Sequence, residues 1–301
     1  MKRNTWLPYL LLTLTVLFWS GNFVLGRGIR ELIPPVSLNY WRWVGALMIL
    51  IPFSWRAVRR QRVLLLTHWK LLALLALPSI TIFNTFIYTA LQTTTAINTA
   101  LVNAMIPIFI SVIAWVAFKE RLTLRQAAGV CISLAGLVFI VTRGNYAALK
   151  MLTLSSGDFW TLGASLSWAI YSVMLRKRPA GMDPIAFLTA IIIIGLLYAL
   201  PFYVWEVWHK GAFKLTIPSL AALGYVALFP SVLSYTFWNS GVVKVGANRA
   251  GIFIHLMPVF SVVLAMLFLD ERLRLFHFFG ILLIFIGIVL TTVRSFRKAP
   301  D

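Results

Sequence analysis

Amide and aromatic side chains recur inside long apolar stretches of this chain, where buried polar groups mark functional positions or helix–helix contacts. Trp19 and Asn22 form one such pair, and Trp168 and Tyr171 form another much later in the sequence. Residues three apart share a helical face, so each pair presents an aromatic and a polar group together. We expect the two faces to form opposite walls of one solute-binding cavity. The alternative is that both Trp residues belong to an interfacial aromatic belt.

Two further apolar stretches have the same character. Asn84 and Tyr88 lie in the first, and Tyr235, Trp238 and Asn239 lie in the second. Asn84 with Tyr88 and Tyr235 with Asn239 are spaced four apart, which places each pair on one helical face. Such groups either line an aqueous path or bond across helices as structural glue. We favour the path, because amide and aromatic groups recur at corresponding places.

Arg42, Asn103 and His255 extend the candidate site. The planar guanidinium of Arg42 could bind a substrate carboxylate, or its side chain could snorkel to the headgroups. His255 could titrate near neutral pH and couple transport to protons, or it could be a packed histidine with satisfied hydrogen bonds.

Two prolines and two glutamates lie at matching places. Pro107 and Pro258 fall inside apolar runs, where proline frees an upstream carbonyl, so we expect both to bend helices around the cavity. Glu120 and Glu271 lie at the ends of runs, each beside an arginine. Each glutamate either forms a gate-like pair with an arginine or lies in a solvated turn. No Asp or Glu lies in the middle of a run, so a buried carboxylate that couples protons is not supported.

The elements that position these residues must be membrane helices. The chain has 301 residues, of which 60% are hydrophobic and 12% charged, with a mean hydropathy of +0.89. Soluble domains carry roughly 25% charged residues. One spanning helix takes about 20 apolar residues. We therefore predict an all-α polytopic membrane protein with about ten spanning helices. The runs are 7–26, 35–55, 70–91, 96–118, 123–142, 158–176, 184–206, 218–239, 246–269 and 275–294.

The charge pattern gives an orientation. The net charge is +19, but the basic residues gather at the ends of the runs, with Arg56, Arg59, Arg60 and Arg62 as the strongest cluster. The positive-inside rule then places both termini in the cytoplasm. The loops are short, so no soluble catalytic, nucleotide-binding or nucleic-acid-binding domain fits. Cys131 is the single cysteine, and we predict no cofactor and no metal site.

The sequence also repeats internally. A shift of 151 residues places Pro107–Gly136 on Pro258–Gly287, with glycines in register. We predict two halves, 1–147 and 148–301, with about five runs each. An odd number of runs makes the second half enter the membrane from the opposite side, as in transporters with inverted repeats around a central cavity.

These residues resemble a known family. Trp19-Ser20-Gly21-Asn22-Phe23 ends the first run, and the turns Lys119-Glu120-Arg121-Leu122 and Asp270-Glu271-Arg272-Leu273 follow proline-bearing runs. The pattern, from Leu7 to Arg294, is similar to the EamA-type branch of the drug/metabolite transporter superfamily. The resemblance implies a ten-helix transporter in the bacterial inner membrane that exports small metabolites, often amino acids. Its glycine-marked helices are compatible with a homodimer.

Several alternatives stay open at this point. The solute could be a drug-like amphiphile, a purine or a sugar, and polar helices around a pore would also suit a channel. An enzyme is disfavoured, since the four histidines are far apart and no hydrolase or phosphate-binding motif occurs. We predict a secondary transporter whose partners are the lipid bilayer and a small solute.

Overall fold

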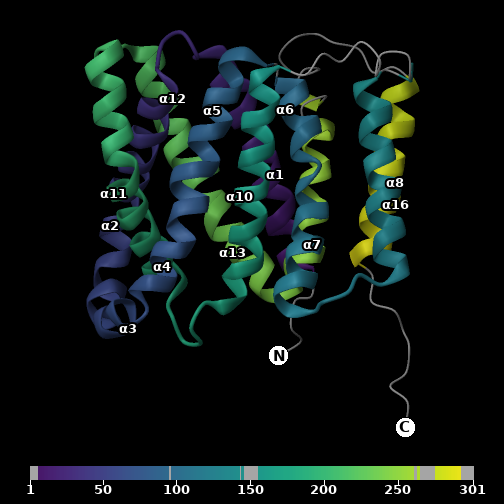
Figure 1. The fold of residues 1–301 in the computed structure, drawn as a ribbon, viewed down its shortest axis with the longest axis horizontal. Coiled ribbons are helices and arrows are strands. Elements are labelled where there is room, and N and C mark those ends of the chain that lie inside the picture. Colours follow the sequence, from purple (N-terminus) through teal and green to yellow (C-terminus); the bar gives the residue numbers. More distant parts are fainter. Residues whose placement is uncertain are drawn as a thin grey trace.

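The fold is built of helices that stand side by side (Figure 1). The computed structural model describes residues 6–94, 96–142, 144–145, 155–260, 263–264 and 275–292, and no strand occurs among them. Among these described residues, five segments are long and apolar enough to cross a membrane. They are Leu7–Gly28, Trp69–Thr93, Thr99–Phe118, Pro184–Lys210 and Ile217–Val245. The prediction of an all-helical, multi-pass membrane protein is confirmed.

Each run predicted from the sequence overlaps one or more helices. In the first half these are α1 (Leu7–Gly28), α2 (Pro35–Arg60), α3 (Arg62–Thr67), α4 (Trp69–Ala76), η1 (Leu77–Ile82), α5 (Phe83–Thr93), α6 (Ala96–Asn103), α7 (Ile106–Phe118) and α8 (Leu124–Val141). In the second half they are α10 (Ser156–Met174), η2 (Leu175–Lys177), α11 (Pro184–Lys210), α12 (Ile217–Ala227), η3 (Leu228–Leu233), α13 (Ser234–Val245), α14 (Ala247–Gly251), η4 (Ile252–Leu256) and α16 (Leu275–Thr292). Pro35 and Pro184 begin their helices, where a missing N–H costs nothing.

Two of the long spans are α-helices interrupted by a π-helical turn. η1 joins α4 to α5 and contains Pro78, while η3 joins α12 to α13 and contains Pro230. Proline lacks the N–H that an α-helix needs, and a π-turn accommodates the missing bond. The carbonyls of Ser79 and Pro230 consequently accept hydrogen bonds from side chains of other helices.

Pro107 and Pro258 each follow an interruption of another kind. α6 ends at Asn103, and α7 begins after a turn at Ala104 and Met105, with Pro107 in its first helical turn. Pro258 lies just after the 3₁₀ segment η4. Each proline lacks the N–H that would pair with the carbonyl four residues upstream, which fits an irregular turn just before it, and the bend expected at each proline stays a prediction.

α8 and α16 pack closely along small residues at one end of the molecule (Figure 1). A Cβ on Gly129 would lie 2.7 Å from the carbonyl oxygen of Gly287, and one on Gly136 would lie 2.6 Å from that of Gly280. No real Cβ sits so close to a backbone oxygen. These glycines therefore allow the two backbones to touch.

α2 and α11 form the opposite end of the molecule and are tied together at both ends. The buried carboxylate of Glu206 in α11 accepts hydrogen bonds from the backbone N–H of Ser37 at 2.7 Å and from its hydroxyl at 2.8 Å. A carboxylate at a helix N-terminus binds otherwise unpaired N–H groups. At the other end, Gln61 bonds to the backbone of Gly181 and Asp183.

Candidate functional site

An aromatic cluster fills the centre of the molecule between α1, α10 and α13. The rings of Trp19 and Trp168 meet edge to face with centroids 4.9 Å apart, and Trp238 lies 5.3 Å from Trp19. Tyr235 lies 5.2 Å from Trp168, and Trp43 in turn lies 4.8 Å from Tyr235. All five side chains are buried, so the interfacial-belt alternative for Trp19 and Trp168 is wrong.

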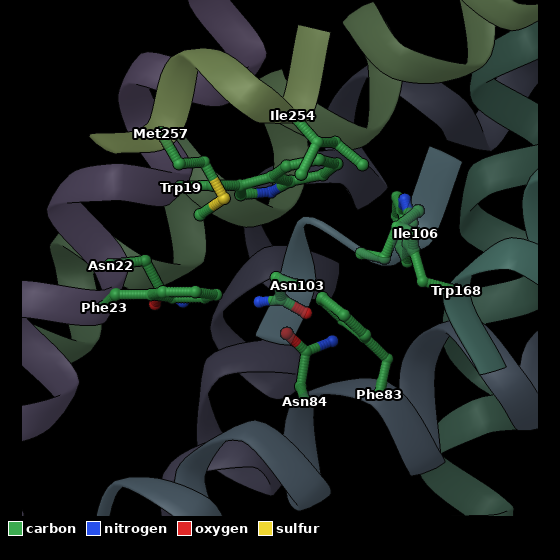
Figure 2. Close-up of a pocket in the computed structure, with 10 residues that line it drawn as sticks. All are labelled: Trp19, Asn22, Phe23, Phe83, Asn84, Asn103, Ile106, Trp168, Ile254 and Met257. Atoms are coloured by element: carbon green, nitrogen blue, oxygen red, sulfur yellow. The ribbon is translucent and has the colours of Figure 1, made fainter. Parts of the chain in front are cut away.

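The central pocket adjoins this cluster (Figure 2). Its lining residues are Trp19, Asn22, Phe23, Phe83, Asn84, Asn103, Ile106, Trp168, Ile254 and Met257. Asn84 and Asn103 point toward one another between the rings (Figure 2). The free volume is ≈ 10 Å³, enough for about one water molecule. The central pocket has the predicted mixture of rings and amides, but it is closed around a space too small for a metabolite.

Arg42 lies beside the central pocket, fully buried. Its Nη1 donates to Asn84 Oδ1 and to Tyr88 Oη, both at 2.8 Å, its Nε donates to Ser231 Oγ at 2.7 Å, and its Nη2 donates to the Pro230 carbonyl at 3.0 Å. The guanidinium also stacks 5.1 Å from the Trp43 ring. These contacts rule out snorkelling, the alternative for Arg42.

The amide of Asn84 continues this network to the π-turns. Its Nδ2 donates to the Ser79 carbonyl at 3.1 Å and to Tyr235 Oη at 3.0 Å, and Tyr235 Oη donates to the same carbonyl at 2.6 Å. Trp19 Nε1 donates to the Pro230 carbonyl at 3.2 Å. The Ser79 carbonyl is thus held by one side chain from each half, and the Pro230 carbonyl of the second half is held by two side chains of the first.

Two Tyr–Asn hydrogen bonds flank the central Trp19–Trp168 contact. Tyr88 Oη donates to Asn22 Oδ1 at 2.7 Å, which joins α5 to α1, and we name this the upper bond. Tyr171 Oη donates to Asn239 Oδ1 at 2.6 Å, which joins α10 to α13, and we name this the lower bond. The four residues are all buried.

His255 bridges two helical interruptions. Its Nδ1 lies 2.7 Å from Ser133 Oγ, and its Nε2 lies 3.1 Å from the Ala104 carbonyl. A carbonyl only accepts, so Nε2 carries a proton, and Nδ1 can accept from the Ser133 hydroxyl. A neutral imidazole therefore satisfies both contacts. Asn103, close by, bonds to Ser165 Oγ at 2.7 Å.

A second pocket, the lower vestibule, is lined by residues at the ends of α7, α10 and α13 and in the segments that follow them. These helix ends lie at the lower side of Figure 1. The volume of the vestibule is ≈ 380 Å³, within the range of small-molecule sites. Ser172, Arg176, Arg178 and Val242 are among its lining residues, and so is Glu120, which pairs with Arg176. Partial burial lowers the pKa of the Arg178 guanidinium, and Asp183 opposes that shift. Ser172 accepts a hydrogen bond from Trp238 at 3.2 Å, so the vestibule ends at the aromatic cluster.

The structure divides the predicted site residues into groups. Five of them line the central pocket, namely Trp19, Asn22, Asn84, Asn103 and Trp168. Six more lie in the surrounding network of rings and hydrogen bonds, namely Arg42, Tyr88, Tyr171, Tyr235, Trp238 and Asn239. His255, Pro107 and Pro258 belong to the interruptions nearby, and Glu120 lies in the vestibule, while Glu271 lies outside the described residues.

Sequence reasoning missed several contributors. Trp43 packs on Tyr235, and Ser79, Pro230 and Ser231 supply the acceptors of the π-turns. One sequence feature points to them, because the dipeptide Pro-Ser occurs at 78–79 and at 230–231, well inside two of the predicted runs, as well as at 218–219, where the second of these runs begins.

Known proteins are similar over most of this chain. The model of the EamA-like transporter family matches residues 6–142 and again 155–293. The uncharacterized transporter YyaM of Bacillus subtilis (strain 168) is 23% identical over 283 residues, which are 93% of this chain and 92% of that protein. A probable amino-acid metabolite efflux pump of Escherichia coli (strain K12) is 28% identical over 191 residues, which are 60% of this chain and 62% of that one.

A solved crystal structure has the same fold. It superposes with a TM-score of 0.74 at 16% identity, and the match covers 95% of this chain and 96% of the other. The family match accounts for both parts of the chain and confirms the resemblance to the drug/metabolite transporters. The chain therefore belongs to the EamA-like transporter family and is a membrane transporter, not an enzyme.

Proposed function

We propose that the protein is a secondary transporter that exports small metabolites, amino acids with aromatic or apolar side chains among them, across a bacterial inner membrane by alternating access. The observation that carries the proposal is the pair of Tyr–Asn bonds on either side of one closed central pocket. Transporters of this kind open a central site to one side at a time.

The two bonds correspond under the sequence repeat. A shift of 149 residues takes Asn22 to Tyr171, and a shift of 151 takes Tyr88 to Asn239. The same hydrogen bond is thus present in both halves, with the two residue types exchanged. The halves 1–147 and 148–301 would then be inverted repeats of about five spanning helices each.

Helix directions support the inversion. Arg27 near the end of α1 binds the carbonyl of Leu91 near the end of α5, and Thr94 just after α5 binds Asp158 at the start of α10. α1 therefore ends, and α10 begins, at the same side of the molecule. Asn22 follows Trp19 along α1, and Tyr171 follows Trp168 along α10. Because the two helices run in opposite directions, Asn22 and Tyr171 lie on opposite sides of the Trp19–Trp168 contact. The upper and lower bonds would therefore close opposite access routes.

The orientation follows from charge. The loops and helix ends at the lower side of Figure 1 carry Arg56, Arg59, Arg60, Arg62, Lys70, Lys119, Arg121, Arg125, Arg176, Lys177, Arg178, Lys244 and Arg249. The upper side carries Arg27, Arg30, Lys210 and Lys214 among the described residues. The positive-inside rule then makes the lower side cytoplasmic, with both termini there, and the lower vestibule would be the cytoplasmic entrance.

The test is counterflow in proteoliposomes that contain the purified full chain. Saturable exchange of labelled phenylalanine, methionine or threonine, with mutual competition, is the expected result, and an imposed pH gradient tests whether protons drive it. If no amino acid exchanges, drug-like amphiphiles, purines and sugars are the next solutes. Flux that rises linearly with solute concentration, without counterflow, would instead indicate a channel.

A further inference from the structure

The buried guanidinium of Arg42 has no acidic partner in the part of the chain that the structure describes. Its contacts are an amide oxygen, two hydroxyl oxygens and a backbone carbonyl, all of them neutral. A buried cation within a membrane protein is costly unless a counter-charge is near, and such a residue marks a functional site.

The five described carboxylates are all engaged elsewhere. Glu31 pairs with Arg30, Glu120 with Arg176, Asp183 with Arg60 and Glu206 with Lys210, and Asp158 accepts from Thr94. Glu206 additionally binds the start of α2. Within the described chain, then, the centre of the molecule carries one positive charge that neutral oxygens alone solvate.

The residues between Arg42 and the central pocket suit an anion. Asn84 lines the pocket, and its Oδ1 faces Arg42 because guanidinium can only donate. Asn22 also lines the pocket, and its Oδ1 is occupied by the Tyr88 hydroxyl, so its Nδ2 remains as a donor. An anion that displaces the Asn84 oxygen would meet the guanidinium and the Asn22 amide together.

We infer that the central site binds metabolites that carry one carboxylate on an apolar body, and that this carboxylate takes Arg42 as its counter-ion. The inference rests on the proposed function and specifies its substrate class. One guanidinium matches one carboxylate, in a planar two-bond geometry that lysine does not reproduce. The rings of Trp19, Phe83 and Trp168 supply the surface for the apolar body. A solute of the same shape that lacks a carboxylate would leave the charge of Arg42 uncompensated.

The experiment compares two probes of the same shape, 3-phenylpropanoate and 3-phenylpropanamide, which differ in the carboxylate alone. Binding to the purified full chain in detergent is followed by the rise in unfolding temperature with probe concentration. We expect wild type to bind the acid about tenfold or more tightly than the amide, as a charge-assisted pair in a buried site would give. Phenylalanine, which has the same carboxylate, should compete with the acid.

Two variants test Arg42 directly. Arg42→Gln should lower the affinity for the acid about tenfold or more and leave the affinity for the amide unchanged, while Arg42→Lys should lie between. Arg27→Gln is the matched control, because Arg27 is also an arginine near the end of a span but binds backbone carbonyls of Leu91 and Gln92. It should keep the wild-type ratio of affinities.

The outcomes separate the inference from the proposed function. Equal affinities of wild type for acid and amide, or an unchanged ratio in Arg42→Gln, overturn the inference and give Arg42 a purely structural role. If Arg42→Gln does not fold, the wild-type ratio and Arg42→Lys still decide. If neutral solutes show counterflow and acids are not preferred, the protein is a transporter and the inferred specificity is overturned. If no solute shows counterflow, the proposed transport function is overturned, and the binding measurements in detergent still test the role of Arg42.

Discussion

The lower bond between Tyr171 and Asn239 should hold the central pocket closed toward the lower vestibule, and Tyr171→Phe tests this. The substitution removes one hydroxyl and keeps the ring, which packs 5.2 Å from Trp168. Both residues of the bond are buried. The closed state loses its hydrogen bond, whereas an open state would expose Asn239 to water, which can replace the missing partner.

The size of the effect follows from the surroundings of Asn239. Its Nδ2 already has no hydrogen-bond partner in the described structure, so after Tyr171→Phe the whole amide would be unsatisfied in the closed state. Leaving a buried polar group unpaired costs about 1–3 kcal/mol. The equilibrium between closed and open forms should therefore shift toward the lower-side-open form by about 5- to 150-fold.

The assay measures access to the central pocket from each side. Cys131, the single native cysteine, is first replaced by Ser, and Met257→Cys then places a reporter thiol in the pocket lining. A membrane-impermeant thiol reagent is applied to intact cells and, separately, to inside-out vesicles. Tyr171→Phe should speed labelling from the lower side, which we propose to be cytoplasmic, and slow it from the other.

Two comparisons make the test specific. Tyr88→Phe breaks the upper bond and should have the opposite effect on the two sides. Tyr225→Phe removes a hydroxyl that bonds to the Phe18 carbonyl at 3.2 Å, outside both bonds, and should leave both rates unchanged. Labelling rates in Tyr171→Phe within twofold of the parent on both sides, or faster labelling from the upper side, would refute the assignment of the lower bond as a closure.

Three further predictions concern stability and coupling. Gly136→Val should weaken the α8–α16 contact at a cost of about 1–3 kcal/mol and so lower the unfolding temperature in detergent. Gly224 faces open space, so Gly224→Ala should leave the unfolding temperature unchanged. Equal unfolding temperatures of the two variants would argue against close packing of α8 on α16. Glu206→Ala should destabilise the protein by about 1–3 kcal/mol, because the buried N–H of Ser37 loses its acceptor, while an alanine at the exposed Glu31 should cost less than about 0.5 kcal/mol. His255→Gln should leave the pH profile of transport unchanged, since a neutral ring satisfies both of its contacts; a flattened profile would restore proton coupling through this residue.

Composition was sufficient to predict that this protein folds in a lipid bilayer. A chain with 12% charged residues cannot cover a water-facing surface, and its apolar runs are long enough to span a bilayer, so helices follow from the need to pair every backbone N–H and C=O internally. The helices of the structure overlap the predicted runs because proline and capping residues mark their starts, as with Pro184 and the Thr123–Gln126 capping box. The family, too, was predicted from paired motifs and is confirmed by the match to both parts of the chain.

Helical spacing was also sufficient to select most of the candidate site. Trp19 with Asn22 and Asn84 with Tyr88 share faces by their spacing alone, and polar faces of membrane helices turn away from lipid. What spacing cannot give is the partner of each group. That Tyr88 bonds to Asn22, and Tyr171 to Asn239, depends on how α5 lies against α1 and α10 against α13.

The sequence by itself thus determined the membrane, the helices, the repeat and the polar faces, because these depend on local composition and period. The tertiary structure alone decided the environment of Arg42, two turns into α2, where neither snorkelling nor ligand binding could be preferred from its neighbours in the chain. Its contacts come from α5 and from the π-turn η3, which lie more than forty and nearly two hundred residues away. Only packing brings such distant oxygens around one guanidinium, and the missing counter-charge becomes visible only when they are all in place.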